Sequence, residues 1–383
     1  MKKLLLSVVT VLMAFSASAV EFLYNGAYLQ ATTDTSTYIV WTTDVATEGW
    51  VEISGGDLKG KIFYESSNGI KLTRRNHRLP IEGLAPATIY TYKVYSKDPR
   101  SAAVIVQEKN IKGEALTFTT LDKSKKEISW LMATDIHYNK YVENLFQTIF
   151  TPERLADKDF VIFDGDIADS FASEKIHFDR LFSTITATFA SNMPYYMARG
   201  NHETRGAGAH QYMTFHPSWT GMPYYSFRHG PVYFIVLDGG EDKPDSDIEY
   251  YGTAQFDNYR SNEGKWLKSV TESKDFQEAP FRVVITHIPL TSRGWHGGIH
   301  AHAMLAPHLE AGNIAVAISG HTHRYSYRDL GKDNQNFPTL VFAPEQYLDI
   351  KANEKTLTIL VKGLNGEVLN TFTYDSKKIG QTR

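Results

Sequence analysis

Short runs in which apolar and polar residues alternate dominate residues 20–121 of the chain. One run covers residues 37–43, and another covers residues 88–95, where Tyr90 and Tyr92 lie on one face at a period of two. Gly, Asp, Asn and Pro separate these runs, as is typical of antiparallel β-structure. The pattern predicts a small all-β sandwich at the N-terminal end.

The pattern changes after a polar stretch at residues 122–127, which we interpret as a linker between residues 20–122 and residues 123–383. Segments with helical spacing follow, for example at residues 141–150 and 178–189. Apolar runs of strand length occur among them, at residues 128–133, 160–163, 194–197, 282–285 and 314–318. This alternation predicts an α/β domain whose strands are largely buried.

Residues 1–19 have the composition of a secretory signal peptide. Two lysines precede an apolar run at residues 4–15, which ends in Ser-Ala-Ser-Ala. A buried N-terminal helix is the alternative interpretation. No later stretch approaches the ~20 apolar residues of a membrane span. We therefore expect an exported protein, periplasmic or secreted, whose mature chain begins near Val20.

Composition narrows the possible chemistry. With 40 basic and 43 acidic residues, the chain has a net charge of −3 and no overall signature of nucleic-acid binding. Cysteine is absent, which excludes disulfides, thiolate metal sites and cysteine nucleophiles. Thirteen of the 14 histidines lie between His137 and His323. The candidate chemistry is therefore concentrated in the second domain.

Each of the five predicted strands in that domain is followed directly by side chains that can bind a metal ion. These residues are Asp135, His137, Asp166, Asp169, Asn201, His202, His287, His321 and His323. Functional groups collect at the carboxyl ends of strands in α/β sheets, and residues two apart leave a strand in the same direction. Nitrogen and oxygen ligands without sulfur suit iron, zinc or manganese. There are more candidate ligands than one metal ion needs, which indicates two ions.

Each motif alone has a simpler explanation, such as a surface Asp and His, a turn with a helix cap, or a solvated loop. The conjunction of the motifs and their order favour a common site. In that order they resemble the calcineurin-like metallophosphoesterase superfamily, over residues 128–326. The segment at residues 83–92, Gly-Leu-x-Pro-x-Thr-x-Tyr-x-Tyr, resembles the fibronectin type III-like domain of purple acid phosphatases.

The resemblance implies a four-layer β-sandwich flanked by helices and a centre of two metal ions. It assigns one ion to Asp135, His137, Asp166 and His323, and the other to Asp166, Asn201, His287 and His321. Asp166 would bridge the two ions, and His202 would donate a proton to the leaving group.

The chain departs from purple acid phosphatases at one position. Those enzymes carry a tyrosine ligand three residues after the bridging aspartate, and this chain has Asp169 there. We therefore expect no purple colour, and a role for Asp169 in orienting a metal ligand. His296 follows His287 at a spacing similar to that of the substrate-facing histidines of the family. For His300, His302 and His308 we favour a solvated helix face.

The function predicted from these features is hydrolysis of small phosphate monoesters, by attack of a metal-bound hydroxide with His202 as general acid. Phosphodiesters or nucleotides as substrates of the same site are the first alternative. A surface-binding protein with a degenerate catalytic domain is the second, and the complete set of ligand residues argues against it. The sequence leaves the metal identity and the oligomeric state open.

Overall fold

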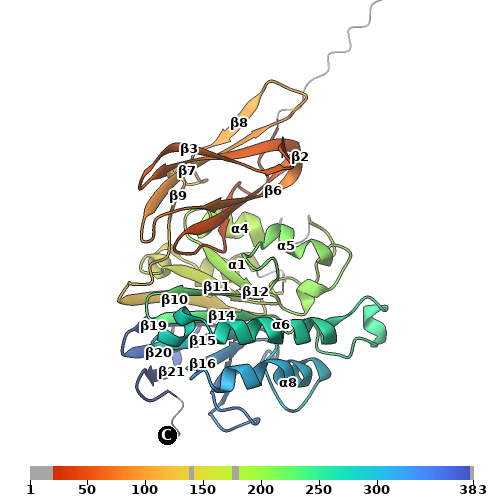
Figure 1. The fold of residues 1–383 in the computed structure, drawn as a ribbon, viewed down its shortest axis with the longest axis vertical. Helices are drawn as coiled ribbons and strands as arrows, with labels where there is room; N and C mark the ends of the chain where they lie inside the picture. The colour runs from red at the N-terminus through yellow and green to blue at the C-terminus, as the bar shows by residue number, and fades with distance from the viewer. Residues whose placement is uncertain (1–19, 138–141, 175–180, 380–383) are drawn as a thin grey trace, which may run out of the picture.

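The computed structural model of the chain describes residues 20–137, 142–174 and 181–379. Its N-terminal part consists of strands, as Figure 1 shows in red and orange. They are β1 (Tyr28–Gln30), β2 (Ser36–Gly55), β3 (Leu58–Tyr64), β4 (Ser66–Ser67), β5 (Ile70–Lys71), β6 (Thr73–Glu82), β7 (Ile89–Lys97), β8 (Val104–Gln107) and β9 (Thr117–Thr119). The predicted all-β N-terminal sandwich is confirmed.

The long strand β2 organises this sandwich. Its first half pairs with β6 and its second half pairs with β3 and β7, with irregular register between Thr42 and Thr47. A bulge of this kind bends a strand, so that one strand can serve both layers. Trp41 and Tyr92 are fully buried between the layers. The face predicted for Tyr90 and Tyr92 is therefore the core face.

The second part contains two sheets packed face to face. The first has the order β21-β20-β19-β10-β11-β12, and the second has the order β13-β14-β15-β16-β18-β17. The strands of the first are β10 (Glu127–Ala133), β11 (Phe160–Asp164), β12 (Tyr195–Ala198), β19 (Gln346–Asn353), β20 (Thr356–Gly363) and β21 (Val368–Asp375). Those of the second are β13 (Tyr225–His229), β14 (Val232–Leu237), β15 (Phe281–Thr286), β16 (Val316–Ser319), β17 (Ser326–Arg328) and β18 (Thr339–Val341).

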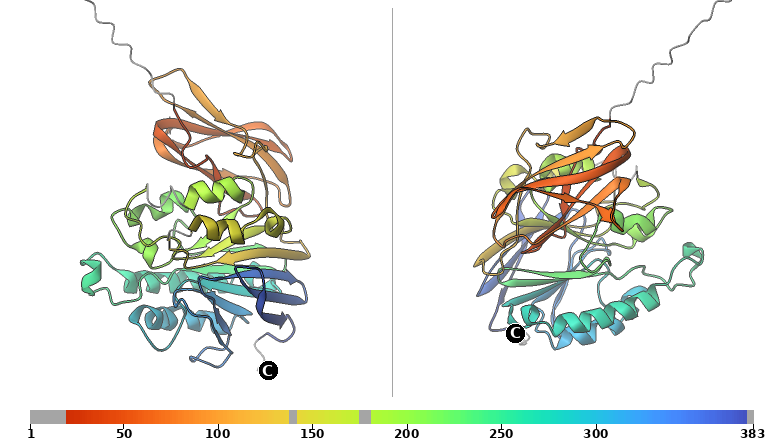
Figure 2. Two further views of the ribbon diagram at one scale, coloured as in Figure 1. Left: turned by 180° about the vertical axis from the view of Figure 1, so that it is seen from behind. Right: turned by 45° about the horizontal axis from the view of Figure 1, so that its top comes forward.

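Helices cover the outer face of each sheet (Figures 1 and 2). The first sheet carries α1 (Val142–Ile149), α2 (Pro152–Leu155), α4 (Ser183–Ile185), the π-helix η2 (Thr186–Ala190) and α5 (Tyr212–Phe215). The second carries α6 (Phe256–Thr271), α7 (Lys274–Glu278) and α8 (His296–Glu310). Trp130 and Phe234 meet edge to face between the sheets, with ring centroids 5.0 Å apart. The expected four layers, helix, sheet, sheet and helix, are confirmed.

All five strands predicted in this domain exist, as β10, β11, β12, β15 and β16. The helix expected at residues 141–150 is α1. The helix expected at residues 178–189 lies partly outside the described residues, and its described end is helical. The signal peptide expected at residues 1–19 also lies outside them. In the described part of the chain, no helix has the length and apolar character needed to cross a bilayer.

The two parts of the chain are in direct contact. Strand β1 pairs antiparallel with β2 and, at Gln30 and Tyr195, parallel with β12, so that one sheet runs from the N-terminal strands into the second domain. The Tyr92 hydroxyl donates a hydrogen bond of 2.6 Å to the carbonyl of Ser191, directly after η2. The N-terminal sandwich therefore rests on the helices that cover the first sheet.

We predict that Tyr92→Phe lowers the free energy of unfolding by about 1 kcal/mol, because it removes this buried hydrogen bond between the two parts. Tyr95→Phe is the matched control, since Tyr95 lies on the opposite face of β7 and donates to the partly exposed Glu52. Water can replace that partner, so the control should change stability by less than about 0.5 kcal/mol. Urea denaturation of the two variants measures the difference, and equal effects would contradict the prediction.

Candidate metal centre

The candidate residues lie in five loops that meet where the two sheets face each other. Backbone hydrogen bonds tie these loops together. The amide of Asp135 donates to Gly165 over 3.1 Å, and the amide of His137 donates to Asp166 over 3.0 Å, so the loops after β10 and β11 are linked. The amide of His321 reaches across from the second sheet to the Asp135 carboxylate, at 3.0 and 3.1 Å.

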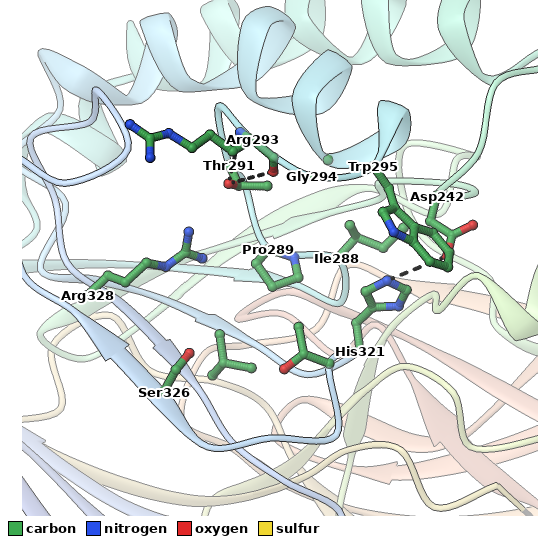
Figure 3. Close-up of a pocket in the computed structure, with 13 residues that line it drawn as sticks. Asp242, Ile288, Pro289, Thr291, Arg293, Gly294, Trp295, His321, Ser326 and Arg328 are labelled. Carbon is green, nitrogen blue, oxygen red and sulfur yellow. Dashed lines mark hydrogen bonds and ion pairs between the residues drawn. The ribbon is translucent and has the colours of Figure 1, made fainter.

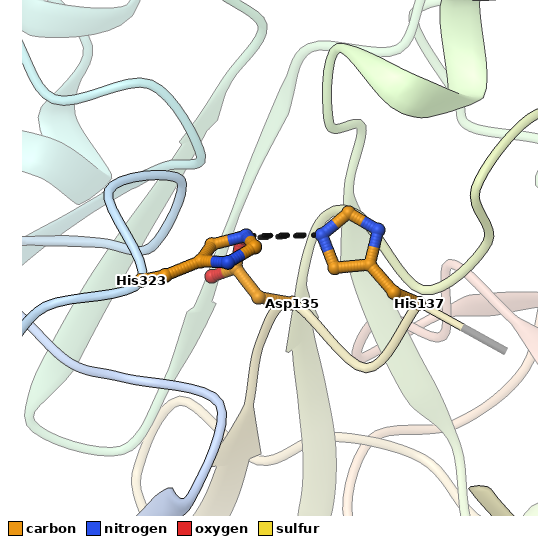
Figure 4. A group of neighbouring side chains, drawn as sticks. All are labelled: Asp135, His137 and His323. Carbon is orange, nitrogen blue, oxygen red and sulfur yellow. Dashed lines mark hydrogen bonds and ion pairs between the residues drawn. The ribbon is translucent and has the colours of Figure 1, made fainter. Parts of the chain in front are cut away.

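Asp135, His137 and His323 form the first group of potential ligands (Figure 4). The Nε2 atoms of the two histidines are 3.0 Å apart, and Asp135 Oδ1 lies 3.2 Å from His323 Nε2. Two ring nitrogens that face each other beside a carboxylate are the donor set of a metal cation.

Asp166, His287 and His321 form the second group. Asp166 Oδ2 lies 2.9 Å from His287 Nε2 and 3.8 Å from His137 Nε2, so this carboxylate faces both groups. Asn201 joins the second group, because its Oδ1 atom lies 3.0 Å from His321 Nδ1. The structure therefore brings these seven residues together, and their division between two ions stays a prediction.

The hydrogen bonds of His287 test whether this donor set fits a metal. Its Nδ1 atom lies 2.5 Å from the carbonyl oxygen of Asp164. A carbonyl only accepts, so Nδ1 carries a proton, and Nε2, which faces Asp166, is the ring atom that can hold either a second proton or a metal ion through its lone pair. The facing Asp166 and Asp135 raise the pKa of His287, although burial, the largest influence, acts the other way. A proton and a metal cation compete for that lone pair.

The ionisation of the neighbouring groups also suits cation binding. Burial acts to raise the pKa of Asp135, but His287 and a hydrogen bond from His323 outweigh it and hold that pKa below its usual range. The pKa of Asp166 is likewise low, with burial opposed by His287. Burial and the charge of His287 lower the pKa of His321 to about 4. The site thus offers ionised carboxylates together with a neutral imidazole at neutral pH.

Backbone strain is concentrated in the same loops. Five of the candidate ligands adopt the left-handed conformation, which non-glycine residues avoid: Asp135 (φ +50°), His137 (φ +46°), Asp166 (φ +49°), His321 (φ +67°) and His323 (φ +54°). Such residues persist only where their surroundings over-determine them, and they gather at functional sites. The strain marks these loops as shaped for convergence of their side chains.

Gly165 shows how closely the loops approach one another. Its φ is +76°, and a Cβ atom built there would lie 2.5 Å from Cγ of His287. A Cβ on Gly200 or Gly320 would collide with the carboxylate of Asp166 or Asp135, respectively. The absence of a Cβ atom at these glycines thus allows the loops to approach one another this closely.

Asp169 and His202 lie beside the first group. Asp169 Oδ1 lies 3.2 Å from His137 Nδ1, where it can orient the imidazole of His137. His202 Nδ1 donates a hydrogen bond of 2.7 Å to the carbonyl of Asp169. Its amide donates to Asp166 over 2.9 Å. His202 is thus held in place by Asp169 and Asp166, and its Nε2 atom lies 4.0 Å from Asp166 Oδ2.

His296 is placed differently from these residues. Its Nε2 atom lies 2.8 Å from Oδ1 of Asp257 on α6, so its imidazole is engaged between the two helices. His300 faces the same aspartate, with Nδ1 at 3.6 Å. His300, His302 and His308 are each partly buried on α8, rather than on a freely solvated face. The substrate-facing role of His296 stays a prediction.

The family profile described as Calcineurin-like phosphoesterase matches residues 130–325, about half of the chain. The chain belongs to this family. The matched segment contains every strand end that carries a candidate ligand. The family assignment and the convergence of these side chains therefore concern the same part of the molecule.

Two curated relatives of this phosphoesterase-family chain are plant proteins. Purple acid phosphatase 18 of Arabidopsis thaliana is 26% identical over 181 residues, which are 42% of this chain and 36% of that protein. Purple acid phosphatase 21 of the same plant is 23% identical over 262 residues, which are 65% of this chain and 52% of that protein. The chain thus spans between a third and about half of these relatives.

Solved structures show the same fold over nearly the whole chain. Purple acid phosphatase PPD1 from yellow lupin (Lupinus luteus) seeds has a TM-score of 0.66 at 17% identity and covers 92% of this chain and 74% of its own. A structure of PhoD has a TM-score of 0.64 at 12% identity, and the match covers 93% of this chain and 90% of the PhoD chain. At such low identity the likeness concerns the fold alone.

Glu203 is the principal residue that sequence reasoning missed. It follows His202 in the 3₁₀-helix η3 (His202–Thr204) and is fully buried. Its carboxylate accepts hydrogen bonds of 2.8 to 3.1 Å from four backbone amides, those of Asp166, Ile167, Ala168 and Gly200. Burial and the nearby Asp166 raise the pKa of Glu203 to about 7, whereas the amide bonds act to lower it. Glu203 thus joins the loops after β11 and β12, a role that its position in the sequence does not indicate.

A second missed cluster borders His202. Arg205 forms an ion pair with both carboxylate oxygens of Glu241, and its Nη1 atom lies 3.3 Å from His202 Nε2. Asp242 follows, with Oδ2 at 3.7 Å from His321 Nε2. Both acidic residues fall in the segment 239–252, which matches no motif, so only the folded arrangement identifies them.

We predict that Glu203→Gln destabilises the protein by about 2 kcal/mol or more, because either orientation of the amide aims an NH₂ group at two buried amide donors. Glu345→Gln, on an exposed residue, is the matched control and should change stability by less than about 0.5 kcal/mol. Thermal denaturation compares the two variants. A Glu203→Gln protein as stable as the control would show that the four hydrogen bonds do not hold the loops.

Proposed function

We propose that the chain hydrolyses phosphate monoesters at a centre of two metal ions. The observation that carries the proposal is the convergence of seven ligand-type side chains at one place, where the Asp166 carboxylate faces both His137 and His287. Membership of the calcineurin-like phosphoesterase family and the fold shared with a purple acid phosphatase support it. Nitrogen and oxygen donors without sulfur fit iron, zinc or manganese.

In this proposal, Asp135, His137, Asp166 and His323 hold one ion, and Asp166, Asn201, His287 and His321 hold the other. Such ions, when bound, would activate a water molecule and offset the charge of the phosphoryl group. Asp169 is a positioning residue, because its contact is with the Nδ1 atom of His137. With Asp169 in place of a tyrosine ligand, iron would give no purple tyrosinate absorption.

His202 is the proposed proton donor to the leaving alkoxide. Its Nδ1 proton is held by the carbonyl of Asp169, so Nε2 is the atom available to the substrate. Arg205 also donates toward Nε2, and its own charge is balanced by Glu241. To act as an acid, the imidazole must carry a second proton, on Nε2, and Nε2 must exchange its contact with Arg205 for one with the leaving oxygen.

We also propose that the protein acts outside the cytoplasm. The basic and apolar pattern of residues 1–19 supports this location. The intact mass of protein recovered from the extracytoplasmic fraction tests it, since retention of Met1–Ala19 would contradict cleavage near Val20.

Parallel assays with p-nitrophenyl phosphate and bis-p-nitrophenyl phosphate distinguish monoester from diester hydrolysis.

We predict about two metal ions per active chain, and loss of both ions and activity in Asp166→Ala, which removes a ligand from each group. Asp157→Ala is the matched control, because Asp157 precedes β11 and lies at the opposite end of that strand from Asp166. Elemental analysis and phosphatase assays of both variants measure the effect. Near-full activity and two ions in Asp166→Ala would overturn the proposed centre.

We predict that His202→Ala keeps its metal ions and loses about 10²–10⁴-fold of its activity on alkyl phosphates, whose leaving groups need a proton. The loss on p-nitrophenyl phosphate should be much smaller, since nitrophenolate leaves without one. Kinetics on both substrates and metal content are measured on one preparation. Equal losses with intact metal would exclude the acid role, and lost metal would make His202 a ligand.

A further inference from the structure

A cavity of about 490 Å³ opens beside the candidate metal centre (Figure 3). The loop between β15 and α8 forms one wall, and β17 with the loop before it forms another. His321 belongs both to this cavity and to the second group of potential ligands. A phosphoryl group bound at the centre would therefore have its ester group directed toward this cavity.

The end of the cavity next to the centre is acidic and aromatic. Asp242 lies against His321 there, and Trp295 stands beside it with 59% of its surface exposed. Ile288, Pro289 and Val341 supply an apolar floor. An exposed indole over an apolar floor favours a flat, apolar segment of ligand. The Asp242 carboxylate disfavours a further anion at this end.

The end away from His321 is basic. Arg293 and Arg328 both line it, as Figure 3 shows. Arg328 forms an ion pair with Asp333, which neutralises part of its charge. Among the described residues, no carboxylate lies within ion-pair distance of Arg293. Two arginines that line the same end of a cavity, one of them without an acidic partner, favour the binding of a carboxylate or phosphate there.

We propose that this cavity selects phosphate esters whose leaving group carries a flat apolar segment and, beyond it, a second anionic group. The ester phosphate lies at the metal centre, the apolar segment lies between Trp295 and Pro289, and the second anion binds Arg293 and Arg328. This inference rests on the proposed function and adds the class of substrate to it.

The test compares substrates that differ in one charge. The probes are 4-carboxyphenyl phosphate and 4-carbamoylphenyl phosphate, which have similar shapes, and the corresponding two-ring esters of carboxybiphenyl and carbamoylbiphenyl, which span a longer distance. For one of the two lengths, we expect kcat/KM to favour the carboxylate by about tenfold or more, mainly through KM.

The variants assign that preference to the basic end. Arg293→Gln should reduce the preference for the carboxylate several-fold, because it lowers kcat/KM on the carboxylate ester far more than on the carbamoyl ester. Asp333→Asn should increase the preference, because it releases the Arg328 guanidinium. Arg100→Gln, on an exposed arginine of the N-terminal sandwich, is the control and should change neither rate.

Equal kcat/KM for carboxylate and carbamoyl esters at both lengths would overturn the inference, as would a preference that Arg293→Gln leaves intact. Calorimetric binding of 4-phosphonobenzoate and phenylphosphonate, and of the corresponding two-ring phosphonates with and without the carboxylate, separates this result from failure of the proposed function. If no ester is hydrolysed by the metal-loaded protein, the hydrolase proposal fails. The cavity is then judged by the carboxylate's effect on phosphonate affinity alone, and no effect overturns it.

Discussion

The arrangement of this site depends on one buried carboxylate, that of Glu203, which accepts hydrogen bonds from amides in two different loops. Together with the hydrogen bond from the His202 amide to Asp166, that link holds the loops carrying Asp166 and Asn201 to each other. The link also sets the electrostatic character of the site. Several carboxylates lie near one another away from water, which is unfavourable until positive charge is added. The fold thus keeps these carboxylates close together, and a bound cation would offset their mutual repulsion.

The arrangement of these loops has an energetic cost. The left-handed backbone conformation costs of the order of 1 kcal/mol at each residue such as His137 and His323, because these residues carry a Cβ atom that glycine lacks. Burial elsewhere offsets this cost. The two facing sheets enclose a continuous apolar layer that includes Trp130, Phe160 and Phe234. The packing of the two sheets therefore stabilises the strained loops and determines where the strand ends can meet.

The sequence predicts most of this arrangement because its strongest signals are local. A fully buried strand such as β11 is a continuous apolar run, and ligand-type residues directly after it need no long-range information. Pairings made across the chain leave no such trace. The three-residue strand β1 is too short to show a period, and the contact of His296 with Asp257 joins helices whose relative position no spacing encodes. Glu203 was missed for the related reason that its partners are backbone amides, which every residue has.

The position of β1 has a further consequence for the association of the protein with itself. Strand β12 would be the free edge of the first sheet if β1 did not pair with it, and all four of its residues are buried. An uncovered apolar edge is a template on which a second chain can add a strand. The N-terminal sandwich thereby covers the start of that edge at Tyr195, and a chain without it would expose there a surface suited to aggregation.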